Sequence, residues 1–413
     1  MRPTGDSREQ ASLRRALGPW LLTLYGLGST IGAGIYALVG KIAGEAGYQA
    51  PLAFLVAAVL AAFSALSFAE LAGRYPQSAG ESAYVRAGFR QRWLSRLTGL
   101  LVVMIGIISA AALMRGLAGY INALLPVGLG ISILATLAVL TAIAVWGIRE
   151  SAMAAALITL VEIGGLFLVI LVSLWHIDTV DSLPSLIPER LDGEMLHGVM
   201  AGAFLGFYAM IGFEDMVNVA EEVRDVGRTM TMAITLTLVI TTLLYMGVAW
   251  SALVWVTPAQ LAQSDAPLAL VFETITGKEP LLITLVAVLA VVNGGLILLV
   301  MASRVLYGMS RMKQLPSWFG HVSRRTQTPV NATLFTALLI MLLSLMLPLE
   351  HLARMTAGIA LTVFSLVNLS LVLVKLRRET APAGILRLPL AVPLAGFIVS
   401  AGFVIWEIAK RFL

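Results

Sequence analysis

The sequence contains no cysteine and few charged residues. None of its 413 residues is Cys, so the chain has no disulfide, no thiolate metal site and no cysteine nucleophile. Only 12% of the residues are charged, against about 25% in an average soluble domain. The net charge of +5 does not indicate nucleic-acid binding, because in so apolar a chain the distribution of charge between loops matters more than the total. We expect no nucleic-acid partner.

Histidine is scarce as well. The four histidines fall in loops or near the ends of apolar segments: His176, His197, His321 and His351. This placement argues against a metal site or a histidine proton relay within a membrane. A polytopic membrane enzyme would need Ser, His, Asp or Cys grouped at the membrane surface, and a channel would need a repeated filter-like loop; neither pattern occurs. We therefore expect no catalytic residue, no metal ligand and no cofactor.

Long apolar runs make up most of the chain. Hydrophobic residues account for 59% of the sequence, and apolar runs of about 20 residues, each long enough to span a bilayer, recur from end to end. The predicted spans cover approximately residues 20–40, 51–72, 97–125, 128–147, 152–175, 196–220, 230–256, 281–308, 330–348, 352–376 and 389–409. The sequence thus predicts an all-α polytopic membrane protein with about eleven transmembrane helices.

Lysine and arginine are unequally divided between the loops on the two sides of these spans. The side that includes the N-terminus carries 21 of the 28 basic residues, and the opposite side carries 7. Basic residues collect on the cytoplasmic side of membrane proteins. We therefore expect a multi-pass protein of the cytoplasmic (inner) membrane with its N-terminus in the cytoplasm. Because the predicted number of spans is odd, we expect the C-terminus outside.

Four glycines fall within nine residues in the first span. They are Gly26, Gly28, Gly32 and Gly34, at a depth where a membrane helix is usually rich in Leu and Val. Glycine releases the backbone from helical geometry, and freed N–H and C=O groups are tolerated in a bilayer only where they line a cavity or are buried in protein. Glycines at this spacing also allow helices to pack closely. The stretch alone leaves both interpretations open.

The sixth span contains a second candidate interruption. Gly206 and Gly212 lie near its middle, and the acidic pair Glu214 and Asp215 follows directly. Charge at that depth is costly unless it faces water or a partner. The first and sixth spans are five apart, and this odd offset gives them opposite orientations in the membrane. Interrupted helices at matching places in two inverted halves point to the substrate site of a transporter, so we favour broken helices over packing.

Four segments resemble motifs of one transporter family. Residues 28–36 resemble the first-helix motif of the amino acid–polyamine–organocation permeases, and residues 207–214 with 220–222 resemble their sixth-helix motif. Residues 68–76 and 303–311 resemble the ends of the second and eighth helices of that family. The four segments occur in the same order as in the family.

This resemblance implies a LeuT-type fold, a five-plus-five inverted repeat, with one additional helix where most relatives have two. The expected parts are a cytoplasmic N-terminal segment 1–19, a first repeat 20–175, an external loop 176–195, a second repeat 196–376 and an extra helix within 377–413. The resemblance further implies secondary active transport of an L-amino acid by alternating access.

An amino acid offers a carboxylate and an ammonium group to such a site. The N–H groups freed after Ile31 lie at the positive end of a half-helix and suit the carboxylate, while carbonyl groups freed at the two breaks suit the ammonium. The resemblance implies the same division. Three roles stay open for the aromatic side chains of Phe207, Tyr208 and Phe213. Each contacts the substrate, closes the site as a gate, or serves only in packing. The candidate substrate-binding residues are Gly28, Thr30, Ile31, Gly32, Ala33, Gly34, Phe207, Tyr208, Ala209, Met210, Ile211, Gly212 and Phe213.

Glu162 is the one acidic residue placed well inside an otherwise apolar span, the fifth. A buried carboxyl group favours its neutral form and can carry a proton near neutral pH. Asn293, in the eighth span beside two glycines, is a weaker polar candidate for the same role. Some relatives resemble this segment with Lys in place of Glu, where the charge replaces a sodium ion. Proton coupling, sodium coupling, plain exchange and a purely structural Glu162 all stay open, as does a cationic or polyamine substrate facing this acid.

Three further features carry expectations. Residues 80–93 mix aromatic and basic side chains, which predicts an interfacial helix or a loop anchored by its aromatics. The apolar run 268–272 is too short to span and predicts a hairpin over the external entrance. Glu70 with Arg74 is a candidate gate pair at the cytoplasmic end of the spans, as is Arg304 with the acids after the sixth-span break. Solvated loop charges are the alternative.

Overall fold

The computed structural model describes residues 17–32, 34–77, 80–146, 152–179, 192–311, 313–321, 323 and 328–409. The α-helices are α1 (Pro19–Ile31), α2 (Gly34–Ala46), α3 (Ala50–Arg74), α4 (Gly80–Phe89), α5 (Arg92–Leu124), α6 (Leu129–Trp146), α7 (Ala152–Trp175), α8 (Gly193–Met210), α9 (Val226–Trp255), α10 (Pro258–Gln263), α11 (Pro267–Thr276), α12 (Leu281–Arg311), α13 (Val330–Met346), α14 (Leu349–Leu376) and α15 (Ala391–Ala409). The 3₁₀ segments are η1 (Gly47–Gln49), η2 (Ile177–Thr179), η3 (Phe213–Glu222) and η4 (Ser317–Gly320).

The described helices identify the chain as a polytopic membrane protein. Eight helical segments among the described residues are long and apolar enough to cross a membrane, and α6 and α13 are slightly shorter apolar helices. Large apolar side chains such as Trp175, Leu243 and Met346 are 85%, 67% and 75% exposed on the outer faces of these helices. Such exposure suits a lipid environment, where an apolar surface has no contact with water. The prediction of an all-α polytopic membrane protein is confirmed.

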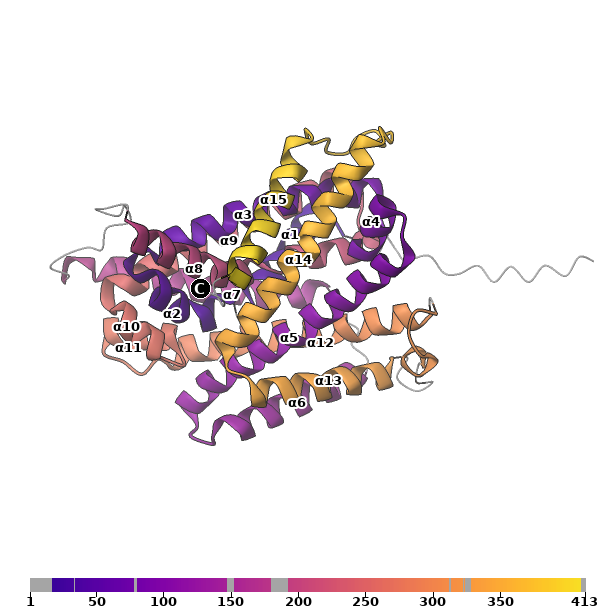
Figure 1. Ribbon diagram of the computed structural model, residues 1–413. Coiled ribbons are helices and arrows are strands. Elements are labelled where there is room, and N and C mark those ends of the chain that lie inside the picture. Colours follow the sequence, from indigo (N-terminus) through magenta and orange to yellow (C-terminus); the bar gives the residue numbers. More distant parts are fainter. Residues whose placement is uncertain are drawn as a thin grey trace, which may run out of the picture.

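The helices form one bundle in which partners far apart in sequence lie side by side (Figure 1). The long helix α5 packs along α12 and also contacts α14, while α6 and α13 pair at one edge. The C-terminal helix α15 packs against α14 and α3. The short helices α10 and α11 lie beside α2 at one end of the bundle, and α4 lies at the other end.

Both predicted helix interruptions are present. The first span is divided into α1, which ends at Ile31, and α2, which begins at Gly34, with Gly32 between them at φ +21°. The sixth span is divided at Gly212, whose φ of +130° is open to glycine and strained for other residues, and it continues as the 3₁₀ segment η3. The backbone therefore leaves helical geometry in both spans.

The glycines of α1 also pack closely against other helices. A Cβ atom on Gly28 would clash with Thr159 of α7, and one on Gly26 would clash with Met216 of η3 and Thr237 of α9. The two interpretations of the glycine-rich stretch thus apply to different residues. Gly26 and Gly28 allow close approach, and Gly32 allows the break.

The two predicted peripheral features are helical. Of the two alternatives for residues 80–93, a helix or a loop, residues 80–89 form a helix, α4. A Cβ atom on its first residue, Gly80, would clash with Val217 of η3. The run 268–272 lies within α11, which forms a helical hairpin with α10. A Cβ atom on Gly40 of α2 would meet the backbone of Leu261 in α10, so this hairpin lies directly on α2.

Candidate substrate-binding site

The two interruptions meet each other in the interior of the bundle. A Cβ atom on Gly212 would lie 2.7 Å from the carbonyl carbon and oxygen of Ser29 in α1. A Cβ atom on Gly34, the first residue of α2, would lie 3.0 Å from Cα of Ala209 in α8. Backbone touches backbone at both places, so only glycine fits without displacement. The sequence places its glycines where the two broken helices need to approach each other.

Part of the polar backbone at these breaks is satisfied by neighbouring groups. Tyr245 of α9 donates its hydroxyl hydrogen to the carbonyl oxygen of Thr30 at 2.9 Å. The N–H of Gly212 donates to Oε2 of Glu214 at 2.8 Å, so this carboxyl group caps the second break. The first N–H groups of α2, from Gly34 onward, have no acceptor within their own helix, and they form its positive end.

A cavity of about 40 Å³ lies between the two breaks, which is room for a few water molecules. It is lined by Ser29, Thr30, Gly32, Gly34, Ile105, Ser109, Leu113, Tyr208, Ile211, Gly212, Glu214, Asp215, Gly294, Leu298 and Met301. The lining residues come from α1 and α2, from α5, from α8 and η3, and from α12. Both broken spans therefore share one cavity with two unbroken helices.

Two walls of the cavity were not found by sequence reasoning. Ile105, Ser109 and Leu113 recur every four residues on α5, and Leu298 and Met301 continue the same kind of spacing on α12. This periodicity is the signal of a helix face. It could not be used alone, because both helices are apolar on all sides and the sequence does not tell which face turns inward.

The remaining wall is acidic. Glu214 and Asp215, the second and third residues of η3, line the cavity and are 6% and 5% exposed. Asp215 accepts a hydrogen bond from the hydroxyl group of Ser29, which joins η3 to the end of α1. No Lys, Arg or His is among the residues that line the cavity. Sequence reasoning noticed this acidic pair as evidence for the break but did not place it at the site.

The sequence was also compared with models of known protein families. A family model described as amino acid permease matches residues 17–409. The chain belongs to this family.

Sequence similarity to individual relatives extends over most of this chain. The chain is 30% identical to cationic amino acid transporter 3, mitochondrial, of Arabidopsis thaliana, over 86% of this chain and 61% of that protein. It is 31% identical to cationic amino acid transporter 2, vacuolar, of the same plant, over 88% of this chain and 60% of that protein. It is 28% identical to the branched-chain amino acid permease BcaP of Bacillus subtilis, over 90% and 83%. The permease therefore spans about three fifths of the length of the two plant transporters.

The predicted binding residues divide into two groups around the cavity of the permease. Those that line it are Thr30, Gly32, Gly34, Tyr208, Ile211 and Gly212. Those that do not line it are Gly28, Ile31, Phe207, Ala209, Met210 and Phe213. Ala33 lies outside the described residues. Both broken spans contribute residues to each group.

The three predicted aromatic residues have different surroundings. Tyr208 faces the cavity, and its hydroxyl group donates to the carbonyl oxygen of Ser109 at 3.3 Å. Phe207 and Phe213 are buried instead against Phe364 of α14, with ring centroids 5.6 Å and 5.4 Å from it. Phe213 also packs edge-on against Phe68 of α3. These two phenylalanines hold the sixth span against α3 and α14.

The two residues proposed for coupling contact each other. Nδ2 of Asn293 in α12 donates to Oε1 of Glu162 in α7 at 3.2 Å, and Glu162 is fully buried. Within the described part of the chain, Oε2 of Glu162 has no hydrogen-bond partner. Tyr36 of α2 donates to the backbone oxygen of Glu162 at 2.8 Å. Asn293 precedes Gly294, which lines the cavity, so the pair lies behind the cavity wall.

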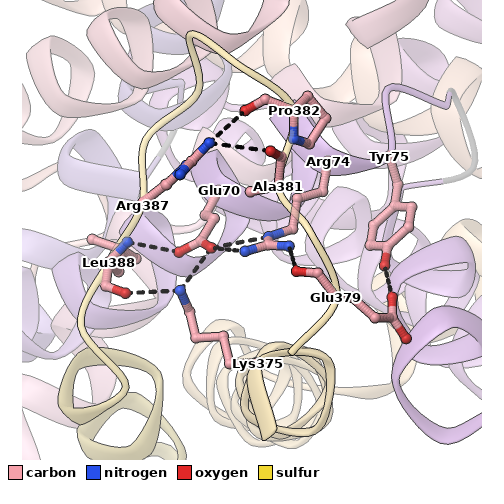
Figure 2. Close-up of polar contacts among 9 residues, drawn as sticks. All are labelled: Glu70, Arg74, Tyr75, Lys375, Glu379, Ala381, Pro382, Arg387 and Leu388. Carbon is pink, nitrogen blue, oxygen red and sulfur yellow. Dashed lines mark hydrogen bonds and ion pairs between the residues drawn. The ribbon is translucent and has the colours of Figure 1, made fainter. Parts of the chain in front are cut away.

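The predicted pair Glu70 and Arg74 exists within a larger polar cluster, shown in Figure 2. Oε1 of Glu70 accepts from Arg74 at 2.8 Å and from Lys375 of α14 at 2.7 Å, and its Oε2 accepts from the N–H of Leu388 at 2.9 Å. The buried carboxyl group thus joins α3, α14 and the loop that leads to α15. Arg304, the other predicted gate residue, is exposed, and no ion pair joins it to a described acid.

A second ionic cluster lies at the opposite end of α14. Arg354 pairs with Glu45 of α2 at 2.5 Å, with Glu350 at 3.1 Å and with Glu407 of α15 at 3.6 Å. The arginine side chain is 13% exposed. Ionic clusters therefore join α14 to its neighbouring helices at both of its ends.

Proposed function

We propose that this permease carries an L-amino acid across the cytoplasmic membrane by alternating access. The observation that carries the proposal is the meeting of two broken helices around one small cavity, which is the arrangement expected of a transporter substrate site. The relatives described as cationic and branched-chain amino acid transporters support an amino acid as the substrate. Their names leave both side-chain classes as candidates.

The substrate carboxylate is placed at the start of α2. The positive end of this half-helix favours a negative charge, as do its first N–H groups, which have no acceptor within the helix. Gly32, which lines the cavity, has no side chain to keep a ligand from the backbone. The ammonium group is placed at the carbonyl groups freed at the ends of α1 and α8. The carbonyl oxygens of Thr30 and Ile31 already accept from the hydroxyl group of Tyr245, at 2.9 Å and 3.4 Å. That of Tyr208 accepts from the N–H of Ile211 at 3.1 Å. The proposed partners of the ammonium group are therefore the remaining carbonyl groups of the two breaks.

Proton coupling is placed at Glu162. An isolated carboxyl group within a membrane is costly when charged, and the amide of Asn293 is the only described side chain that hydrogen-bonds to this one. The carboxyl group is therefore expected to bind a proton and to release it only when a conformational change admits water. Glu162 of α7 is contacted by Tyr36 of α2 and Asn293 of α12. Both α2 and α12 also contribute residues to the cavity lining, so a movement of either helix at the cavity changes the surroundings of Glu162.

The fold supports two inverted repeats, 20–175 and 196–376, followed by the extra helix in 377–413. The interruptions after α1 and α8 occur in spans that are five apart, as such repeats require. The distribution of lysine and arginine supports an N-terminus in the cytoplasm and a C-terminus outside.

Uptake into proteoliposomes tests the function and the coupling. The full-length permease is reconstituted, and uptake of labelled amino acids is measured with and without an inward proton gradient, and separately with a sodium gradient. Wild-type protein is expected to accumulate substrate only with the proton gradient. The variant Glu162→Gln is expected to exchange substrate across the membrane without accumulating it, while the exposed control Glu273→Gln behaves as wild type.

Two results would contradict this scheme. Unchanged pH dependence of uptake by Glu162→Gln would remove the coupling role of this residue. Exchange by the wild type with no response to either gradient would make the permease an exchanger.

A further inference from the structure

Among the described residues, the acidic wall of the cavity has no positively charged partner. Glu214 and Asp215 face the same small space from η3, and none of the residues lining that space is basic. Glu214 is held by the N–H of Gly212 at 2.8 Å and Asp215 by the hydroxyl group of Ser29. These bonds orient the two carboxyl groups, but a hydroxyl or an amide does not neutralise a carboxylate as a cation does.

Two hydroxyl groups of the same cavity point independently to a ligand. Oγ1 of Thr30 and Oγ of Ser109 are buried and have no hydrogen-bond partner among the described residues. Both residues line the cavity and are only 3% and 4% exposed. Buried polar atoms are nearly always hydrogen-bonded in folded proteins, so these two atoms lack a partner that a bound molecule would supply.

The opposite wall is suited to an aliphatic chain. Ile105 and Leu113 of α5 and Leu298 and Met301 of α12 line the cavity without a charged group among them. A ligand that fits all the walls has a carboxylate for the N–H groups of α2, an aliphatic chain for α5 and α12, and a positive charge for the acidic pair.

We infer that Glu214 and Asp215 select the positively charged side chain of a cationic amino acid such as lysine, arginine or ornithine. This inference rests on the proposed transport function and adds its substrate class. The ammonium or guanidinium group of the side chain lies between the two carboxylates, where it forms charge-assisted hydrogen bonds. The cavity of about 40 Å³ has room for only a few water molecules, so substrate entry has to widen it.

A comparison of lysine with norleucine tests the inference on the wild-type protein. The side chain of L-norleucine has the same four carbon atoms as that of L-lysine and lacks the terminal ammonium group. Binding is measured by thermal shift of the purified permease, and transport by competition with labelled substrate in proteoliposome counterflow. Lysine is expected to bind at least about tenfold more tightly than norleucine, as expected for a buried charge-assisted contact. Equal affinities would overturn the inference.

Charge-neutralising variants locate the effect. Asp215→Asn and Glu214→Gln are each expected to weaken lysine binding by at least about tenfold while norleucine binds as well as before or better. The control is Glu273→Gln, which removes an exposed carboxyl group in α11 and is expected to leave both affinities unchanged. Lysine affinity at the wild-type level in both cavity variants would overturn the inference. Because Glu214 caps the break and its variant can fail to fold, Asp215→Asn and the wild-type comparison each decide the question without it.

The outcome also separates this inference from the function on which it rests. If leucine or norleucine is bound and exchanged and lysine is not, the amino acid transporter stands and the cationic substrate is wrong. If none of the twenty amino acids shifts the melting temperature or is exchanged, the transport function itself is wrong, and the inference is overturned with it.

Discussion

Gly212 is the residue on which the contact between the two broken helices depends most directly. Its φ of +130° is strained for any L-residue with a side chain, and an added Cβ atom would lie 2.7 Å from the backbone of Ser29. Gly212→Ala is therefore expected to destabilise the protein by about 3 kcal/mol or more and to abolish uptake. Thermal melting and proteoliposome uptake measure the two effects.

Gly402 provides the matched control for this substitution. It lies within α15, where an added Cβ atom would meet nothing within 4 Å. Gly402→Ala is expected to raise stability slightly, by about 0.5–1 kcal/mol, because alanine favours the helix. An equal effect of both substitutions would show that the contact at Gly212 does not matter.

Glu81, in the first turn of α4, gives a prediction of pH dependence. Burial raises the pKa of this carboxyl group to about 7, and the nearby charge of Asp215 adds to the shift. The unfolded carboxyl group has a pKa of about 4.3, so the neutral form favours the folded state. The stabilisation by Glu81 is fully present below about pH 4.3 and is lost as the pH rises through about 7.

Glu81→Gln removes this titration. The variant is expected to match the wild type near pH 4.5 and to exceed it in stability above pH 8, by at most about 4 kcal/mol. Melting curves of both proteins across this range measure the difference, with Glu273→Gln as the exposed control. A difference that is the same at every pH would contradict the assignment.

Single residues show where sequence reasoning stops. The glycines of both breaks were predicted correctly because glycine at such depth has few explanations. The acidic pair was seen, but its position on the cavity could not be derived, because it depends on the rotation of η3 about its axis. For Phe207 and Phe213 the sequence left substrate contact, gating and packing open. Both pack on Phe364 of α14, a neighbour that the sequence could not supply because it belongs to a distant span.

At the scale of helices, the Glu70 cluster fixes the ends of α3 and α14. Glu70 is fully buried and accepts hydrogen bonds from both Arg74 and Lys375. Removing one partner of a buried ion pair leaves the other charge uncompensated, which costs about 3–5 kcal/mol. Glu70→Gln is therefore expected to lower the melting temperature clearly.

The double variant Glu70→Gln/Lys375→Met tests the coupling between these groups. It is expected to be more stable than the sum of the single effects predicts, because both charges of the pair are removed. Arg90→Gln, which breaks a pair with Glu379 in which the arginine is 70% exposed, is the control and is expected to have little effect. Strict additivity of the two cluster substitutions would contradict the coupling.

The helices themselves were largely predictable. Each predicted span coincides with a described helix or with two halves of a broken one, because the length of an apolar run is a strong signal in a bilayer. The ends were less accurate: α5 begins at Arg92 rather than at 97. Polar and aromatic residues at a membrane surface can continue a helix beyond its apolar part. The hydrophobic pattern of the sequence therefore does not show where such a helix begins.

For the whole molecule, the absence of cysteine makes orientation directly testable. Thr274 of α11 and Ser317 of η4 are both exposed, and the Lys and Arg distribution places them on opposite sides of the membrane. Thr274→Cys is expected to react with a membrane-impermeant maleimide in intact cells, and Ser317→Cys only after the cells are opened. The reverse pattern would invert the topology.

The bridge between Leu17 and Val223 has a consequence for how the protein moves. The N–H of Arg224 donates to the carbonyl oxygen of Leu17 at 3.0 Å, which ties the entry to α1 to the segment between η3 and α9. A main-chain hydrogen bond thus joins the segment just before α1 to the residues just after η3, so the first half of the first span and the second half of the sixth span are connected at their ends. If the proposed alternating access tilts these segments, they are expected to move together as one rigid unit unless this hydrogen bond breaks first.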